Sequence, residues 1–191
     1  MTKTALIILA DGFEDIEAIT PIDLMIRAGI RVTVAGLKSK SVTAAKSGLT
    51  VTVPTLFSCR QDKFDALVLP GGIPGSENLA QSSDLLVLIR TMHHQNKIIA
   101  AICAAPALVL APSGILEGKK ATCFPGMENS FPKSTTFIAS PVVRDGNIIT
   151  SRGAGTAFDF SLAIIDALLG KESCGKVARA TVFQGNTGEQ A

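Results

Sequence analysis

Short apolar runs alternate with amphipathic segments along this chain, and the alternation limits the folds that the chain can adopt. Four segments have the length and apolar character of strands: 4–10, 31–37, 65–69 and 97–102. Apolar residues recur at helical spacing in four others: 14–28, 83–94, 156–169 and 171–183. Strands that are apolar throughout are typical of a parallel sheet covered on both faces. The order predicts an α/β domain with a mostly parallel sheet between two layers of helices.

Two segments depart from this alternation and predict β-hairpins. Residues 41–54 alternate weakly, as a short hairpin excursion would. Residues 137–143 and 147–150 are joined through Asp145 and Gly146, and an Asp-Gly pair suits a type I′ turn. No repeat divides the chain, so residues 1–191 are expected to form one domain, with a loose polar tail from about residue 184.

Composition and charge argue against several classes of protein. The 191 residues carry a net charge of +2 without a basic run, so neither nucleic acid nor an anionic membrane surface is indicated. The apolar segment 4–10 is followed at once by Asp11, Glu14 and Asp15, which is too short and wrongly flanked for a signal peptide. No apolar run approaches membrane-spanning length. We therefore expect a cytoplasmic protein.

The cysteines show no close pairing; they are Cys59, Cys103, Cys123 and Cys174. A domain of this size does not need disulfides, so free thiols in a reducing compartment are expected. Only two histidines accompany them, which argues against a structural metal site. The glycine-rich segment 153–155 precedes a helix but lacks the full dinucleotide fingerprint. The sequence predicts neither a metal nor an organic cofactor.

Cys103 stands where the strand 97–102 must turn into a helix. A residue on such a sharp elbow is exposed at the carboxyl edge of the sheet, and Ala104 and Ala105 are small enough to permit the turn. Pro106 suits the first turn of the following helix, whose N-terminal dipole favours a thiolate. The alternative interpretation is that Cys103 acts only as a small buried hydrophobic residue. Its position on the elbow favours the interpretation that Cys103 is a nucleophile.

Two further strand ends carry groups that would assist a nucleophile. The turn Gly71-Gly72 follows the strand 65–69, and its amides could form an oxyanion hole together with the amide of Ala104. Glu17 lies in the first helix, four residues before Pro21, which removes the usual hydrogen bond to the Glu17 carbonyl. The spacing alone does not choose between Glu14 and Glu17 as the carboxylate of the site.

A Cys/His dyad is not favoured. His93 and His94 fall at the end of the helix 83–94, on the amino side of the strand 97–102. That is the opposite end of the sheet from Cys103. The two residues are therefore better interpreted as surface histidines near a helix C-terminus.

Several motifs together resemble the ThiJ/PfpI superfamily, in particular the branch of the parkinsonism-associated deglycase and its bacterial YajL-like relatives. They are ADGFEDIEA (10–18), PIDLMIRAGI (21–30), LPGG (69–72), AAICAAP (100–106) and TSRGAGTAFDF (150–160). The resemblance runs from about residue 3 to residue 180. It implies a flavodoxin-like three-layer α/β/α sandwich and a homodimer.

The resemblance also assigns roles to residues. It implies that Cys103 is an oxidation-sensitive nucleophile and that Glu17 is the acid hydrogen-bonded to its sulfur. Gly72 and Ala104 match the backbone N–H donors that face the sulfur. Phe124 stands where the human-type pattern has a histidine, so proton transfer would fall to Glu17 or water. Ala104 replaces the histidine that follows the nucleophile in peptidase-type members, and Gly48 lies near the place of a missing arginine.

The sequence supports three hypotheses about function. The first is a cofactor-free deglycase or glyoxalase acting on 2-oxoaldehydes or their adducts with amines and thiols, in protection against oxidative and carbonyl stress. Under this first hypothesis we expect Glu17 to be protonated and to donate a hydrogen bond to the Cys103 thiolate, so that the two groups titrate as a coupled pair. The second is a redox-regulated chaperone or sensor that uses the same oxidisable cysteine. The third is a flavodoxin-like binding module without catalysis.

Overall fold

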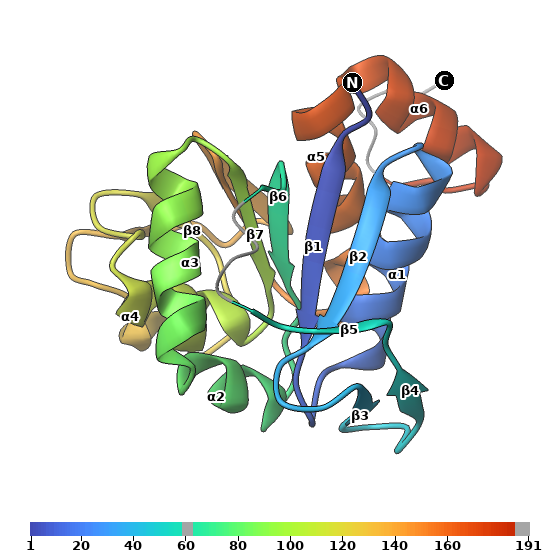
Figure 1. Cartoon of the computed structure of the whole chain (residues 1–191). Coiled ribbons are helices and arrows are strands. Elements are labelled where there is room, and N and C mark those ends of the chain that lie inside the picture. Colours follow the sequence, from blue (N-terminus) through green and yellow to red (C-terminus); the bar gives the residue numbers. More distant parts are fainter. Residues whose placement is uncertain (59–62, 186–191) are drawn as a thin grey trace.

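The computed structural model describes residues 1–58 and 63–185 as a three-layer α/β/α sandwich (Figure 1). Within these residues a seven-stranded sheet has the order β10-β11-β7-β6-β1-β2-β5. Its strands are β1 (Thr4–Leu9), β2 (Arg31–Gly36), β5 (Thr55–Leu56), β6 (Ala66–Leu69), β7 (Ile98–Ile102), β10 (Val142–Asp145) and β11 (Ile148–Ser151). All neighbours are parallel except β10 and β11. The predicted fold class is confirmed.

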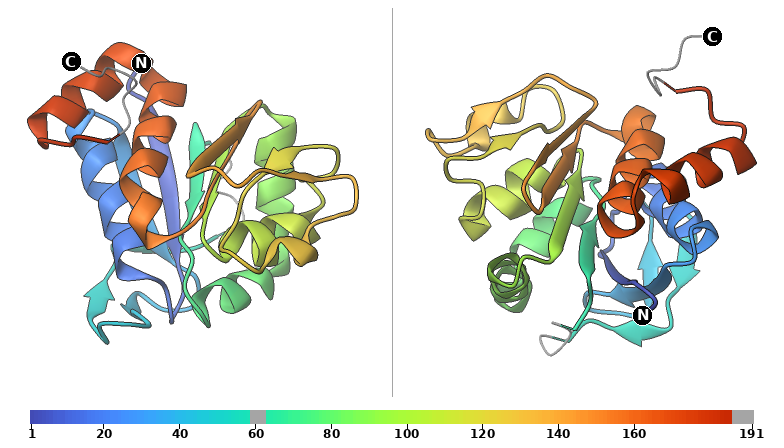
Figure 2. Two further views of the ribbon diagram at one scale, coloured as in Figure 1. Left: turned by 180° about the vertical axis from the view of Figure 1, so that it is seen from behind. Right: turned by 90° about the horizontal axis from the view of Figure 1, so that it is seen from above.

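Helices cover both faces of this sheet (Figures 1 and 2). One layer consists of α1 (Asp15–Arg27), α5 (Ala157–Leu169) and α6 (Lys171–Ala180). The other contains α2 (Gly75–Ala80), α3 (Ser83–His94), the π-helical turn η1 (Pro106–Leu110) and α4 (Ala111–Ser113). The sequence did not predict α2, and α6 ends three residues before the predicted limit. None of the described helices is long and apolar enough to cross a bilayer, and a cytoplasmic location stays a prediction.

Strand β1 shows why its sequence is apolar throughout. Ile7 and Leu9 pack into the core beneath α1 and α5, whereas Leu6 and Ile8 pack into the core beneath α3. Successive side chains of a strand point to opposite faces, so both sets must be apolar when helices cover both faces. Each fully buried side chain of this kind stabilises the fold by about 1.5–3 kcal/mol.

The first predicted hairpin is confirmed as β3 (Ser41–Thr43) paired with β4 (Thr50–Thr52). The second is confirmed as β10 and β11, but its predicted limits and turn type were wrong. Phe137 belongs instead to β9 (Thr136–Phe137), which pairs with β8 (Lys120–Ala121). Pro141 separates the two segments because it has no N–H to donate.

The turn of the second hairpin consists of Gly146 and Asn147, since Asp145 pairs with Ile148. Only Gly146 has a positive φ, of 60°. A single positive φ at the first turn residue corresponds to type II′ rather than to the expected type I′. The remaining short helices are η2 (Glu128–Ser130) and η3 (Ala154–Thr156).

Candidate active site

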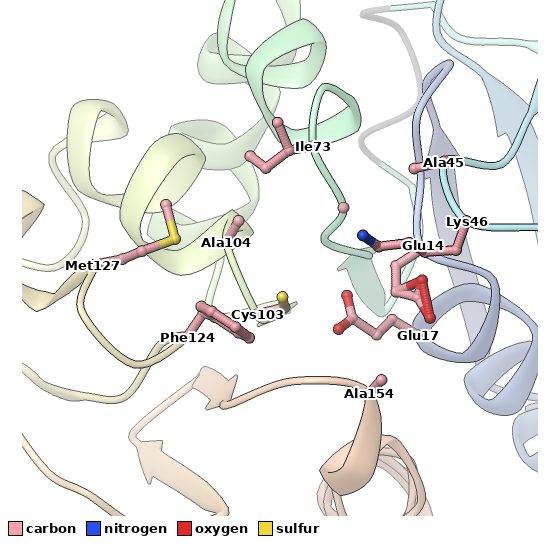
Figure 3. Close-up of a pocket in the computed structure, with 11 residues that line it drawn as sticks. Glu14, Glu17, Ala45, Lys46, Ile73, Cys103, Ala104, Phe124, Met127 and Ala154 are labelled. Carbon is pink, nitrogen blue, oxygen red and sulfur yellow. The ribbon is translucent and has the colours of Figure 1, made fainter.

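The carboxyl ends of β1, β6 and β7 meet at one edge of the sheet because these strands are direct neighbours. Three segments converge there: the first turn of α1 after β1, the Gly71-Gly72 turn after β6, and Cys103 after β7. Figure 3 shows the side chains of Glu17 and Cys103 pointing toward one another at the bottom of a pocket. The convergence expected from the sequence is thus what the fold produces.

Cys103 forms a strained elbow directly after β7. Its φ is 64°, a left-handed conformation that costs a residue with a side chain about 1–3 kcal/mol. The Cys103 N–H donates to the carbonyl of Ser151 at 2.9 Å, and the Cys103 carbonyl accepts from Phe124 N–H at 2.8 Å. Ala104 and Ala105 are buried beside it. These contacts hold the elbow and leave the thiol partly exposed.

The Gly71-Gly72 turn packs against this elbow too closely for side chains. A Cβ atom on Gly71 would lie 2.5 Å from Glu17 Oε2 and 2.6 Å from Cys103 Cβ. Gly72 has a φ of 93°, and a Cβ there would lie 2.4 Å from the carbonyl oxygen of Gly12. Only glycine fits such positions. The close approach brings the Gly72 N–H to the Cys103 sulfur, to which the Ala104 N–H also donates.

Glu17 is the carboxylate that meets the thiol, which answers the choice between Glu14 and Glu17. Its side chain is only 1% exposed, it hydrogen-bonds with Cys103, and its Oε2 accepts from the Gly71 N–H at 2.9 Å. Burial, reinforced by the negative charge of Glu14, raises the pKa of Glu17 to about 7, against the lowering effect of the hydrogen bonds from Cys103 and Gly71. A neutral carboxylic acid is therefore well populated near neutral pH.

Burial also raises the pKa of the Cys103 thiol to about 12, and the charge and hydrogen bond of Glu17 act in the same direction. The N–H groups of Gly72 and Ala104 oppose this effect without overcoming it. The prediction that the elbow favours a thiolate is therefore wrong for the free protein, because burial and the neighbouring Glu17 outweigh the N–H groups. The two groups interact directly, so they titrate as a coupled pair.

The pocket above this pair encloses about 330 Å³. Ile73, Phe124 and Met127 form an apolar wall, and the opposite side carries the charged residues Glu14, Glu17 and Lys46, with Ala154 beside Glu17. Phe124 is 48% exposed and occupies the place where the resemblance puts a histidine in other members. His93 and His94 end α3 at the far edge of the sheet and line a different pocket, as the sequence predicted.

Lys46 is a charged residue of the pocket that the sequence did not predict. It lies in the loop between β3 and β4, which the Ala45 N–H ties to the carbonyl of Phe13 at 2.9 Å. A bridge between Phe13 and Ala44 adds to this attachment. No local pattern in the sequence signals that this loop reaches the site, because the attachment is made by backbone groups.

Two other cysteines, Cys123 and Cys174, are not among the residues that line the pocket. Cys123 is buried, Cys174 is partly buried, and both are free thiols. Cys59 lies outside the described residues. In residues 1–58 and 63–185 no group of three or more His, Cys, Asp or Glu side chains is placed to hold a metal ion. Gly153, from the glycine-rich segment, borders the site, where an added Cβ would lie 3.9 Å from Glu17 Oε1.

Comparison with known proteins decides the family. The family model described as DJ-1/PfpI matches residues 3–167. This chain belongs to the DJ-1/PfpI family. Protein dj-1beta of Drosophila melanogaster is 42% identical over 188 residues, which cover 97% of this chain and 100% of that protein. Its crystal structure superposes with a TM-score of 0.89 over 95% of this chain and 98% of that one.

Two more distant members of the DJ-1/PfpI family bear on function. A Caenorhabditis elegans protein named glutathione-independent glyoxalase DJR-1.2 is 34% identical over 172 residues, covering 89% of this chain and 91% of its own. Toxoplasma gondii DJ-1, in a structure described as oxidized, is 34% identical with a TM-score of 0.91, covering 96% of this chain and 100% of that one.

Proposed function

We propose that this protein is a cysteine-dependent enzyme of the glyoxalase or deglycase type, acting on 2-oxoaldehydes or on their adducts with amines and thiols. Such an enzyme would protect the cell against carbonyl and oxidative stress. The observation that carries the proposal is the contact between Cys103 and the buried Glu17 at the bottom of an open pocket, where burial raises the pKa of both groups. The relative named as a glyoxalase supports it.

In the proposed reaction, the proton shared by the pair resides on Glu17 and the Cys103 thiolate adds to the aldehyde carbon. The Gly72 and Ala104 N–H groups stabilise the negative charge on the oxygen, which takes the proton from Glu17. The Glu17 carboxylate then removes the hydrogen of that carbon as a proton. Glu17 returns this proton to the neighbouring carbonyl carbon while the hydroxyl proton of the first carbon passes to the oxygen of its neighbour, so one carbon is oxidised as the other is reduced.

Water hydrolyses the resulting thioester of Cys103, which releases a 2-hydroxy acid and restores the thiol. With an adduct as substrate, the amine or thiol departs when Cys103 displaces it. This sequence uses only the side chains and N–H groups of the pocket and water, so we propose an enzyme without a metal or organic cofactor. Glu17 serves as acid and base in place of the histidine that Phe124 replaces.

A product assay tests this proposal. Methylglyoxal and its adducts are incubated with the wild type, and lactate is quantified. We expect turnover by the wild type, none by Cys103→Ser, and a loss of 10²-fold or more in Glu17→Gln, the scale of a lost general acid–base group. Turnover that survives in Cys103→Ser would exclude the cysteine mechanism. Ligand-stabilised melting without any turnover would favour the non-catalytic binding module.

A second proposed function is a redox-regulated chaperone or sensor, favoured by the oxidized structure of the Toxoplasma gondii relative. Cys103 would be oxidised by peroxide to a sulfinic acid held by Glu17 and the surrounding N–H groups. Mass spectrometry after graded peroxide tests it. Cys103 must oxidise before Cys59, Cys123 and Cys174, and oxidation must change the binding of partner proteins.

We further propose that the protein forms a homodimer. Three isoleucines of α1 support this, since Ile16, Ile19 and Ile26 lie along one side of the helix and are each about half exposed. Exposed apolar surface of this kind marks protein interfaces. Light scattering coupled to size-exclusion chromatography distinguishes a dimer from a monomer.

A further inference from the structure

A free positive charge stands at the mouth of the pocket. Figure 3 shows the amino group of Lys46 directed into the pocket from the β3–β4 loop. None of the carboxylates in the described part of the chain lies within ion-pair distance of it. The loop is held in place at two points, by the Ala45 N–H on the Phe13 carbonyl at 2.9 Å and by the Ser47 hydroxyl on Asp15.

Glu14 faces the same pocket and is also unsatisfied. Its Oε2 is buried and has no hydrogen-bond partner among the described residues. A carboxylate and an ammonium group thus line one pocket without contacting each other. The negative charge of Glu14 repels an anion from its own side, so at the mouth of the pocket an anionic group is favoured near Lys46.

The size of the pocket indicates that the natural substrate reaches this charge. Methylglyoxal is small and neutral, and it fills only a fraction of about 330 Å³ when its aldehyde carbon lies at Cys103. The remaining space extends from the sulfur toward the mouth. In an adduct, this space holds the amine or thiol carrier of the aldehyde.

We propose that Lys46 is a specificity residue that selects adducts whose amine or thiol carrier bears a carboxylate. The inference rests on the proposed function and names the substrate class within it. Lys46 binds the carboxylate of the carrier while the reacting carbon lies at Cys103. The negative charge of Glu14 keeps the anion on the Lys46 side of the mouth and lowers the overall preference for an anionic carrier.

Two thiols of equal size test this selection. Methylglyoxal hemithioacetals of 3-mercaptopropionate and of its neutral isostere, 3-mercaptopropionamide, are compared at a fixed concentration of free methylglyoxal, so that a rise in rate reports the adduct. We expect kcat/KM to be about fivefold higher for the anionic adduct, the scale of an exposed ion pair. This preference should fall as salt is added.

Variants of Lys46, Glu14 and Lys40 test whether the preference for the anionic adduct depends on the charge of Lys46 in the pocket or only on the overall charge of the protein. Lys46→Met should abolish the preference, Lys46→Glu should reverse it, and Glu14→Gln should increase it. Lys40→Met removes the same charge from an exposed residue that precedes β3 and should behave as the wild type. Equal turnover of both adducts by wild type and all variants overturns the inference alone. No turnover of any adduct or of free methylglyoxal overturns the proposed function, and the inference with it.

Discussion

The N–H of Phe124 donates to the carbonyl oxygen of Cys103 at 2.8 Å. This bond ties the elbow to the segment that follows β8, so the Phe124 ring borders the thiol. The side chain at position 124 is therefore the group that stands next to the sulfur. In this chain it is a phenyl ring, which neither donates nor accepts a proton.

Restoring an imidazole at this position should activate the thiol. In Phe124→His, a protonated imidazole beside the sulfur favours the thiolate and lowers the pKa of Cys103. We expect faster alkylation of Cys103 by iodoacetamide at pH 7, followed by mass spectrometry. Phe124→Leu, which keeps the wall apolar, serves as the control. Equal rates in the two variants would mean that the ring at 124 has no electrostatic influence on the thiol.

Glu17→Gln should change how stability depends on pH. The folded-state pKa of Glu17 is raised to about 7 from an ordinary 4.5. The protonated carboxyl therefore contributes stability that is fully present below pH 4.5 and is lost as pH rises through 7, a loss of about 3 kcal/mol. The neutral amide of Gln does not ionise, so the variant should gain stability relative to wild type across this window.

Urea unfolding between pH 4.5 and pH 8 measures the difference. The same substitution at Glu77, which is exposed on α2, controls for the loss of a charge alone. A constant offset between wild type and Glu17→Gln at every pH would contradict the assigned protonation.

Glu17→Gln should also make the thiol easier to ionise. The charge of Glu17 is among the causes that raise the pKa of Cys103 to about 12, and the substitution removes it while burial remains. We expect the thiolate absorbance of Cys103 to appear at lower pH in the variant, measured in a background where Cys59, Cys123 and Cys174 are replaced by serine. An unchanged titration would show that the two groups are not coupled.

Gly71→Ala should disrupt the site through steric overlap. The added Cβ would fall 2.5 Å from Glu17 Oε2 and 2.6 Å from Cys103 Cβ, so the pair must separate. We expect a loss of stability of about 1–3 kcal/mol and a larger loss of turnover. Gly155→Ala is the matched control, because a Cβ there meets no atom within 4 Å. Thermal unfolding and the lactate assay compare the two.

The central elements of the site could be predicted because local signals mark them. Cys103 follows an apolar strand and is surrounded by alanines, and Gly71-Gly72 follows another. Glu17 also had an available signal, since it shares helical spacing with Pro21 and Leu24, which are buried on the same face. Glu14 is three residues earlier and shares that spacing, but it is the N-cap residue of α1 with an extended backbone, and this could not be predicted from the spacing.

The parts that were not predicted depend on contacts between distant segments. Lys46 reaches the pocket because backbone atoms of its loop bond with Phe13, and no side-chain pattern encodes such a bond. The raised pKa of Cys103 likewise depends on burial and on a carboxylate from another element. Phe137 was assigned to the wrong strand because its apolar character outweighed the interruption at Pro141.

The backbone of Cys103 is bonded to two residues that come much later in the chain, Phe124 and Ser151. During synthesis the cysteine therefore emerges from the ribosome before Phe124 and Ser151, the residues that fix its elbow. The nascent thiol lacks the strained conformation that characterises the finished site. Its distinctive reactivity arises only when the last third of the polypeptide has docked, which makes thiol labelling a late and sensitive reporter of folding.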